Sequence, residues 1–589
     1  MRSALSLALA PLLLPLGLAL GCTHKGGGTT DDTGLSSDGG GYTSVDTSAW
    51  VDTAADGGAS DGGAVSDDTG DTAPVGPVAT ALALYPTRMD VGVGATWSTR
   101  LLATWDDGTV SEADASWQSG NVDVVEVDAS GQVRALAAGD TTVRAERDGL
   151  LVTADVHVRD DGMVTVTVVD AESGLPHAGA HVRLGTDDAE GMTDEAGRIE
   201  LEADGSVALV VSAWDHYRVP VTAYGVMGRS LTLPIRSPDD VSPAMGDIRG
   251  NVDLDGVPTG GGGDIKIGIA APSLGTSPLL VDPALLVGPP REITLYGVTA
   301  NVPANIYVRS AAEDYDLPSA VGTTGIWTVA APLAISDVTS GLAGATDALS
   351  LMLADLDKVV WGWSDGATVA AGETGRADLA PATPLSEALT VDAGPLPVGF
   401  SGTEQALVLV GDMLPAQGFS PTGLGVGRNG VDVHAAPLRL DGTTGRYATA
   451  VAQVGGLGSG TGHAVCTSWA PMDGDEVTLP EFQQVPMLNL FDVVSKDFTL
   501  QTDARARMVH ITIFGGGEGE VRDIVMDGGP VEGTLLNFGS GFGYGSTSWE
   551  IAAFETWQGT YEDMVRDGWP TDTEIARGAW TAGLLTQEP

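Results

Sequence analysis

Basic residues are scarce in this 589-residue chain: 28 lysines and arginines stand against 79 aspartates and glutamates, which gives a net charge of -51 at pH 7. A surface with this charge repels phosphate backbones and offers no basic stripe, so nucleic acid is disfavoured as a partner. The 82 glycines and 32 prolines predict many turns and few long helices. Because the chain is too long for one hydrophobic core, the composition predicts a mainly β, multidomain protein.

Cysteine is nearly absent as well. Cys22 and Cys466 are the two cysteines of the chain and lie far apart in the sequence. A disulfide framework is therefore excluded, and so is a cysteine-based zinc site, which needs closely spaced ligands. No histidine is followed by glutamate, and no Walker-type phosphate loop occurs. We expect no catalytic residues, no metal-ligand set and no bound cofactor.

Residues 1–21 carry one arginine, then an unbroken apolar stretch, then a small residue directly before Cys22. This order is typical of a secretory signal peptide. A transmembrane anchor is the alternative, but Pro11 and Pro15 interrupt the stretch, and the flank after it is Gly-rich and acidic. The four residues from Ala19 to Cys22 resemble a bacterial lipobox, although the commonest pattern of that family has leucine where Ala19 stands.

The lipobox resemblance implies a diacylglyceryl thioether on the Cys22 sulfur and cleavage before it, so that acylated Cys22 becomes the N-terminus. Each buried methylene contributes about 0.8 kcal/mol, so two or three acyl chains would hold the protein permanently in a lipid bilayer. Thr23 stands where aspartate would favour the inner membrane, so the resemblance implies the outer membrane. An ordinary signal peptide that happens to precede a cysteine is the alternative.

Residues 22–77 form an acidic linker of Gly, Ser, Thr, Ala and Asp with the single basic residue Lys25. Low hydrophobicity combined with charge of one sign cannot offset chain entropy, so we expect a disordered tether behind which the folded domains begin. Its Asp-Gly-Gly and Asp-Asp-Thr-Gly units suggest a Ca²⁺ role for acidic loops. No glutamate and no fixed ligand spacing occur there, so a calcium-ordered stalk is the less favoured alternative.

Residues 78–158 alternate runs rich in Val, Leu and Thr with Asp-Gly, Ser-Gly and Ala-Gly-Asp turns, at a spacing that suits a small β-sandwich. Gly94, Trp117 and the run VVEVDASGQVRALAAGDTTVRA make this segment resemble the bacterial Ig-like group 2 domain. The resemblance implies a stalk or adhesive module without a catalytic role. It also implies a core position for Trp117 and turns at Gly131 and Gly139.

Residues 162–238 begin with the alternating Val164, Val166 and Val168, followed by a Gly-Leu-Pro turn. The segment resembles the carboxypeptidase regulatory-like, transthyretin-shaped sandwich, an accessory module that implies no peptidase activity. The matching positions are Gly174, Pro176, Ala180, Val182, Thr193, Asp194 and Gly197. His177 and His181 are close in sequence, but two histidines without a third ligand are more typical of a surface than of a metal site.

Residues 243–395 and 396–589 match no family that we recognise. Their strand-like runs and Gly/Pro turns predict two β-rich domains with a boundary in the Pro-rich stretch at 391–399. One larger β-domain such as a propeller is the alternative, although no repeat of blade length is visible. Spaced leucines favour an amphipathic helix at 336–357, and a second short helix is expected at 573–584.

Three patterns in this region suggest chemistry. His463 could draw the proton of Cys466, but strand alternation places the two side chains on opposite faces, so a buried structural thiol is predicted. The Asp-Gly-Asp-Glu run at 473–476 could touch calcium, although a solvated turn is more common. Tryptophans could stack on sugars, although core or rim positions are more common. These tryptophans are Trp361, Trp363, Trp549, Trp557, Trp569 and Trp580.

Two functions agree with these patterns. The first is a non-enzymatic lipoprotein of the bacterial surface or periplasm, with a structural, adhesive or ligand-binding role toward a polysaccharide or a surface protein. The second is a secreted, lipid-anchored hydrolase that acts on glycans or peptides through paired carboxylates within 243–589. The missing catalytic motifs favour the first function.

Overall fold

The computed structural model describes most of the chain between residues 77 and 587. The gaps lie at residues 107–109, 172, 186–188, 204–207, 238–244, 274–289, 296–297, 309–313, 335, 337–351, 353–355, 398–405, 416, 428–429, 456–462, 492–496, 504, 515–520, 528–530, 535–547, 557–558 and 568–579. The predicted leader, the lipidation site Cys22 and the linker as far as residue 76 lie outside the described residues and stay predictions.

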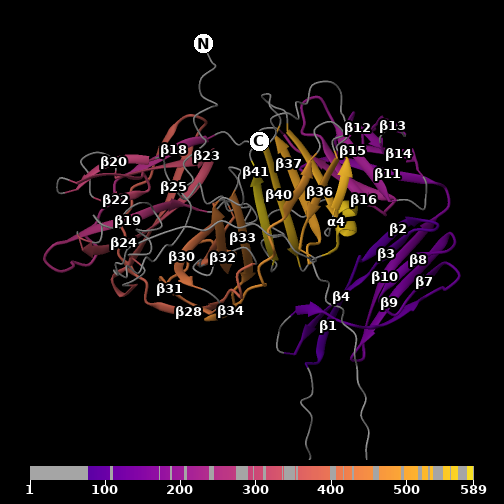
Figure 1. Ribbon diagram of the computed structural model, residues 1–589, viewed down its shortest axis with the longest axis horizontal. Helices are drawn as coiled ribbons and strands as arrows, with labels where there is room; N and C mark the ends of the chain where they lie inside the picture. The colour runs from indigo at the N-terminus through magenta and orange to yellow at the C-terminus, as the bar shows by residue number, and fades with distance from the viewer. Residues whose placement is uncertain are drawn as a thin grey trace, which may run out of the picture. The chain divides into compact units, whose positions relative to one another are not determined.

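The described chain is mainly β (Figure 1). Its strands form several small sheets arranged as tandem β-sandwich-like domains, which confirms the predicted fold class. One sheet is much larger than the others and contains 15 strands. No helix among the described residues is long and apolar enough to cross a membrane.

The first module forms three sheets, in the orders β1-β4-β5, β2-β10-β9-β6 and β3-β8-β7. Strand β2 pairs in parallel with β10, and the other described pairs of this module are antiparallel. The strands are β1 (Ala79–Tyr85), β2 (Arg88–Gly92), β3 (Thr96–Ser98), β4 (Arg100–Trp105), β5 (Val110–Glu112), β6 (Ser116–Ser119), β7 (Val125–Val127), β8 (Gln132–Ala135), β9 (Gly139–Arg147) and β10 (Leu150–Arg159).

The turn between β7 and β8 requires a glycine. Gly131 has a φ of +81°, and a Cβ at this position would lie 2.9 Å from the Trp117 ring. The Trp117 ring is half-buried and packs against two apolar clusters of the module. Gly139 opens β9 with a φ of +147°. The expected turn at Gly131 is therefore confirmed, whereas Gly139 belongs to a strand, where it pairs with Val158, and Trp117 packs against the core while remaining partly exposed.

The second module is a two-sheet sandwich, with strand orders β14-β11-β17 and β13-β12-β15-β16. Val164, Val166 and Val168 of β11 are completely buried between the sheets, as their alternation predicts. The strands are β11 (Met163–Asp170), β12 (His181–Leu184), β13 (Glu190–Met192), β14 (Arg198–Glu202), β15 (Leu209–Trp214), β16 (Val221–Val226) and β17 (Ser230–Ile235).

The rest of the chain falls into three consecutive groups of strands. The first group is β18 (Met245–Gly250), β19 (Asp264–Pro272), β20 (Pro290–Leu295), β21 (Val298–Pro303), β22 (Ile306–Val308), β23 (Tyr315–Ala320), β24 (Gly322–Ala334), β25 (Val360–Val369), β26 (Thr374–Arg376) and β27 (Thr383–Pro384). The second is β28 (Glu387–Asp392), β29 (Ala406–Leu414), β30 (Gly418–Gly427), β31 (Gly430–Ala435), β32 (Gly445–Gly455), β33 (His463–Pro471) and β34 (Glu476–Thr478). The third is β35 (Met487–Phe491), β36 (Asp497–Gln501), β37 (Met508–Phe514), β38 (Val521–Asp527), β39 (Val531–Thr534), β40 (Ser548–Thr556) and β41 (Trp580–Gln587).

The three groups share one pairing pattern. In the first group β19 pairs with β22 and β24, β24 with β25, and β18 with β23. In the second group β29 pairs with β30 and β32, β32 with β33, and β28 with β31. In the third group β37 pairs with β38 and β40, β40 with β41, and β36 with β39. The fold therefore repeats the same connectivity three times.

This repeat is not visible in the residue pattern. In the first group the connection from β19 to β22 is long and carries the β20-β21 hairpin. In the second group the equivalent connection, from β29 to β30, is a tight turn. Because the shared feature is the order of backbone hydrogen bonding, alternation of apolar and polar residues does not encode it. Strand β28, at the end of the predicted 243–395 domain, pairs with β31 and β34 that follow it.

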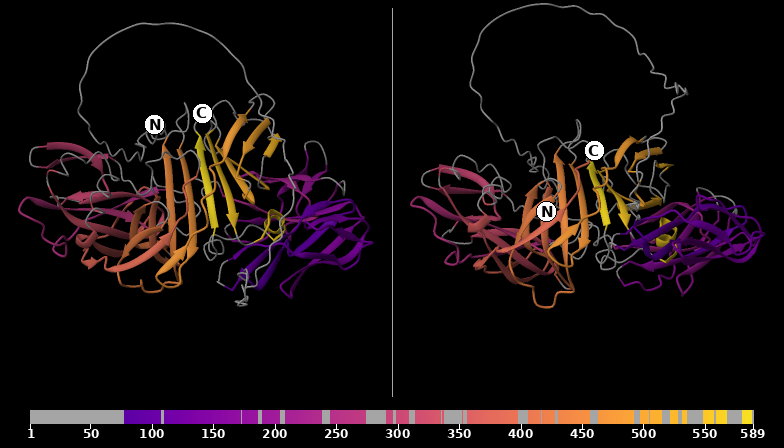
Figure 2. Two further views of the ribbon diagram at one scale, coloured as in Figure 1. Left: turned by 60° about the horizontal axis from the view of Figure 1, so that its bottom comes forward. Right: turned by 90° about the horizontal axis from the view of Figure 1, so that it is seen from below.

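Edge strands join the second module, the third group and the second group into the large sheet. Strands β33 and β41, the equivalent last strands of the second and third groups, pair antiparallel, and Figure 2 shows these long strands side by side. At the other edge of the third group, β38 pairs in parallel with β16 of the second module, from Val221↔Asp523 to Tyr224↔Met526. Both pairings satisfy backbone N–H and C=O groups that a free edge would leave open.

Several strands are buried on both faces and form middle layers. In β24 every residue from Ile326 to Leu333 is buried. Ile326 packs in a cluster with residues of β18, whereas Trp327 packs in a different cluster that includes Phe419 of β30. The indole of Trp361 donates to the Pro421 carbonyl across this layer boundary, at 2.9 Å. Apolar runs without alternation thus correspond to strands covered on both sides.

One of the two helix predictions is wrong, and the other is largely untested. Trp580–Gln587 is strand β41, not the end of a helix at 573–584, because it pairs with both β33 and β40 and these tertiary pairings override local propensity. A helix occurs earlier instead, as α4 (Tyr561–Asp567). Within the predicted helix at 336–357, Ser336 and Met352 are helical and a 3-10 turn follows at Leu356–Lys358, while the remaining residues lie outside the described ones.

Replacing Trp469 with alanine should destabilise the second group strongly. Trp469 is fully buried and packs against Phe419 and Tyr447, with ring centroids 4.9 and 5.0 Å away. The cavity should lower the free energy of unfolding by about 3–5 kcal/mol, measured by urea unfolding followed by near-UV circular dichroism. Leu151→Ala is the control, because Leu151 is 61% exposed. Equal midpoints for the two variants would contradict this packing.

Candidate functional site: the junction at helix α4

The predicted nucleophile and base do not form a site. Cys466 is fully buried in β33, and its thiol donates to the Gln483 carbonyl at 3.3 Å. Burial, together with the charge of Asp503, raises the pKa of this thiol well above its ordinary value. The His463 side chain lies outside the described residues. The prediction that Cys466 is a buried structural thiol is confirmed.

The acidic run at 473–476 is an exposed turn. Gly474 has a φ of +95°, and Glu476 begins the short strand β34. The described part of the chain contains no group of three or more His, Cys, Asp or Glu side chains placed to hold a metal ion. His177 instead contacts Asp215, with Nε2 and Oδ2 2.9 Å apart, and His181 stacks on Trp214.

The tryptophans predicted as a sugar platform are mostly internal. Trp361 and Trp549 are each 3% exposed and belong to the core. Trp363 is partly buried, and its indole donates to Asp365 at 3.2 Å. Trp557, Trp569 and the side chain of Trp580 lie outside the described residues. The described members of this set therefore do not form an exposed aromatic surface.

Asp412 and Glu387 are two interacting carboxylates within 243–589 whose pKa values are shifted in opposite directions. Burial raises the pKa of Asp412, whereas hydrogen bonds from Arg446, at 2.9 and 3.1 Å, lower the pKa of Glu387. Divergent pKa values are typical of an acid and base pair. Asp412, however, is completely buried on β29, where it accepts a hydrogen bond from the Leu440 amide. A substrate cannot reach this carboxylate, so the pair is structural.

A polar cluster that reaches three parts of the chain is built around helix α4, near the C-terminus. Thr560 precedes the helix and exchanges hydrogen bonds with Asp563: the Thr560 amide donates to the carboxylate at 3.0 Å, and the Asp563 amide donates to the hydroxyl at 3.4 Å. This is the reciprocal arrangement of a capping box. Tyr561, Met564 and Val565 bury the apolar face of the helix in the largest core cluster.

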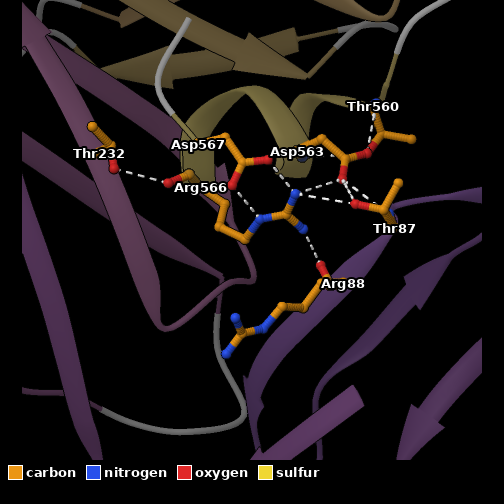
Figure 3. A network of polar contacts seen from close by, with 7 residues as sticks. All are labelled: Thr87, Arg88, Thr232, Thr560, Asp563, Arg566 and Asp567. Atoms are coloured by element: carbon orange, nitrogen blue, oxygen red, sulfur yellow. Dashed lines mark hydrogen bonds and ion pairs between the residues drawn. The ribbon is translucent and has the colours of Figure 1, made fainter. Parts of the chain in front are cut away.

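Helix α4 contacts the first module at the start of β2 (Figure 3). The Thr87 amide donates to Asp563 at 3.0 Å, and the Arg566 guanidinium donates to the Arg88 carbonyl and, at 3.3 Å, to the Thr87 hydroxyl. Asp563 and Arg566 also form an ion pair at 3.1 Å. A second contact joins the same module to the third strand group, where Arg507 lies 3.2 Å from Glu112.

The same helix holds the second module. The Glu562 carboxylate accepts hydrogen bonds from the successive amides of Met227 and Gly228, at 2.7 and 3.0 Å. The Thr232 hydroxyl donates to the Arg566 carbonyl at 2.8 Å. The first two modules also meet directly, because the Arg229 amide donates to the Asp90 carbonyl. Helix α4 therefore lies where two modules and the third strand group come together.

A buried ion pair supports the junction of β16 and β38. Asp523 receives two hydrogen bonds from Arg236, at 2.5 and 2.7 Å, and one from the Thr512 hydroxyl at 3.0 Å. His510 lies 3.2 Å from the same carboxylate. Although burial acts to raise it, His510 and Arg236 together hold the pKa of Asp523 far below its ordinary range. Asp523 is therefore an ionised, fully paired carboxylate.

Glu562 has the opposite electrostatic character. Burial raises the pKa of Glu562 from an ordinary 4.5 to about 7. The hydrogen bonds from the Met227 and Gly228 amides lower this pKa and only partly counteract the effect of burial. Burial likewise raises the pKa of Asp90, on the other side of the junction. Burial therefore favours the protonated form of Glu562 and Asp90 more than water does, whereas Asp563 forms an ion pair with Arg566 in the same junction.

Sequence reasoning missed helix α4, although a local signal for it exists. The segment YEDMVRD has acidic residues in its first turn and an arginine in its last, the charge order that complements a helix dipole. Thr560 before it is a preferred N-cap residue. Nothing in the sequence, however, relates Asp563 to Thr87, because the two residues are 476 positions apart.

No protein-family profile matches this chain, and no curated protein matches it. Weak matches to solved structures exist. Domains 5–6 of the surface-layer protein SbsC match over 43% of this chain and 91% of that one, at 14% identity and a TM-score of 0.14. Invasin, described as a bacterial integrin-binding protein, matches over 64% and 76%, at 10% identity and a TM-score of 0.11. Two B repeats of the collagen-binding protein of Staphylococcus aureus match over 67% and 95%, at 10% identity and a TM-score of 0.11. Scores this low carry no argument about the present chain.

Docking of α4 on the second module should weaken as pH rises. Because the pKa of Glu562 is raised from 4.5 to about 7, the docked carboxyl binds a proton that the free carboxyl releases, so docking loses free energy between these pH values and levels off above pH 7. Hydrogen exchange of the Met227 and Gly228 amides, corrected for intrinsic rates, should be roughly tenfold or more faster at pH 8 than at pH 5. Glu562→Gln should abolish this difference, and the same pH trend in that variant would exclude Glu562 as its source.

Asp563→Ala should loosen the first module. The substitution removes the helix cap and leaves the Thr87 amide without its acceptor, which should cost about 1–3 kcal/mol. Exchange of the Thr87 amide should accelerate, while amides in the middle of β9 should not change. Asp567→Ala is the matched control, because the Asp567 side chain is 63% exposed and does not contact Thr87 in the network of Figure 3. Unchanged exchange at Thr87 in the Asp563 variant would disprove the contact.

Proposed function

We propose that this protein is an exported bacterial lipoprotein with a structural or adhesive role and no catalytic activity. The leader and the lipobox resemblance at Ala19–Cys22 support export and an acyl anchor at Cys22 in the lipid bilayer. Thr23 after the cysteine supports the outer membrane. The acidic linker at 22–77 would act as a tether between that anchor and the folded modules.

The α4 junction is the observation that carries the structural part of this proposal. A tethered protein that presents a surface to a partner needs its modules held in one orientation. Here a helix near the C-terminus binds the first module through Thr87 and Arg88 and the second through Met227 and Gly228. The module next to the tether is thereby fixed to the remainder of the chain.

The alternative is a lipid-anchored hydrolase with its site in 243–589. The interacting carboxylates Asp412 and Glu387, with pKa values shifted in opposite directions, do not favour it, because Asp412 is completely buried. The contacts of these residues are those of an ion-pair network between β29, β32 and β28. These polar contacts therefore support a role in holding the strands of the chain together.

The Cys22→Ala variant should partition into the aqueous phase in a detergent-phase separation. Native protein from the bacterial envelope should partition into detergent and begin at an acylated Cys22, because two or three acyl chains bury tens of methylenes. Detergent-phase partition and intact mass spectrometry measure both properties. A native protein that stays in the aqueous phase with an unmodified cysteine would rule out the anchor, while leaving the α4 junction unaffected.

A further inference from the structure

Three loops of the second module gather at one end of its sandwich. His181, the first residue of β12, pairs with Met192, the last residue of β13, and with Trp214, the last residue of β15. The segment before β12, the segment after β13 and the turn after β15 therefore project from the same end of the sheet. Loops that cluster at one end of a sandwich are a common location of binding sites.

This end lies opposite the α4 junction. Strand β16 runs from Val221 beside the turn after β15 to Val226, next to Met227 and Gly228 that bind Glu562. The end of the module at Gly228 is also bridged to Val91 of the first module. The loop cluster is consequently at the end of the second module that faces away from the module nearest the tether.

Hydrogen bonds hold the three loops together. The Thr193 hydroxyl donates to the His177 carbonyl at 2.7 Å and accepts from the Ala180 amide at 3.0 Å. The His177 ring contacts Asp215 at 2.9 Å, and the His216 amide donates to the same carboxylate at 2.6 Å. The Asp215 carboxylate is thus fixed in orientation and one-third exposed, with its pKa lowered by these partners against the effect of burial.

Large apolar side chains project from this frame into solvent. Tyr217 is 79% exposed, Leu175 is 65% exposed and Met192 is 57% exposed. The His216 ring meets the Tyr217 ring edge-on with centroids 4.7 Å apart, and the His181 ring stacks on Trp214 at 5.3 Å. Exposed apolar groups gathered on a preorganised polar frame are typical of a recognition surface.

The chemistry of this surface favours an uncharged, hydroxyl-rich partner. Asp215 and the exposed Asp194 are acidic, and the whole chain carries a charge of -51, so anionic polymers are repelled. The exposed Tyr217 ring lies beside the polar His216 and follows Asp215 in the chain, unlike a residue in the dry apolar centre typical of protein interfaces. An exposed aromatic ring can cover the C–H face of a sugar, while a fixed carboxylate accepts hydrogen bonds from its hydroxyls.

We propose that the loop cluster formed by residues 174–180, 192–194 and 215–218 binds a neutral polysaccharide, with Tyr217 as the stacking ring and Asp215 as the hydroxyl acceptor. This inference rests on the proposed adhesive function and assigns it to one site. Both residues follow directly after the end of β15, and Asp215 is held by the His177 ring and the His216 amide.

Affinity electrophoresis of the full chain in non-ionic detergent tests the site. Gels containing dextran, soluble starch or galactomannan are the probes, and at least one should retard the native protein. Tyr217→Ala should weaken that retardation about tenfold or more, whereas Tyr217→Phe should keep most of it because the ring remains. Leu151→Ala, a comparably exposed residue of the first module, should behave as native protein. Lack of retardation in all three gels, or equal retardation of Tyr217→Ala, would overturn the proposal.

Binding of the same proteins to intact bacterial cells separates this site from the proposed function. Cells treated with periodate, which destroys vicinal diols, should lose binding, whereas protease-treated cells should keep it. Loss after protease treatment alone would identify a protein partner and overturn the polysaccharide assignment. Periodate-sensitive binding that Tyr217→Ala does not weaken would overturn the site and leave the adhesive function standing. Native protein that binds no cells would overturn both.

Discussion

Pairing between β16 and β38 is the interaction on which the arrangement of this protein depends. It joins an edge strand of the second module to an edge strand far later in the chain, from Val221↔Asp523 to Tyr224↔Met526. Both edges would otherwise expose unpaired backbone groups, which is a liability for any β protein. Because Arg236 neutralises the buried Asp523 at this seam, the pairing tolerates an ionised carboxylate inside it.

The location of α4 follows from that seam. Once the third strand group lies beside β16, the helix that follows β40 reaches Met227 and Gly228 at the end of the same strand. From there Asp563 and Arg566 extend to Thr87 and to the Arg88 carbonyl of the first module. One backbone pairing therefore positions a polar junction that holds both N-terminal modules.

The large sheet also grows by repetition. Three strand groups share the same connectivity, and the antiparallel pairing of β33 with β41 joins the equivalent last strands of two of them. The first group packs against the second, so that β24 is buried on both sides and the Trp361 indole donates to the Pro421 carbonyl between them. An acidic, glycine-rich chain with few aromatics thus builds a large core from short apolar strands.

The sequence by itself determined the mainly β fold class and details that depend on local physics. Val164, Val166 and Val168 are buried as their alternation predicts, because successive side chains of a strand point to opposite faces. Cys466 is buried as predicted, but its neighbours on both faces of β33 are buried too, so tertiary packing and not alternation decided its burial. The sequence did not reveal the threefold repeat, the place of Trp580 in a strand, or the contacts of Asp563 and Glu562. Tertiary structure decided these features because they depend on which strand edges, far apart in the sequence, pair with each other. The backbone groups that form these hydrogen bonds are the same in every strand, so the residue pattern does not specify the partner strand.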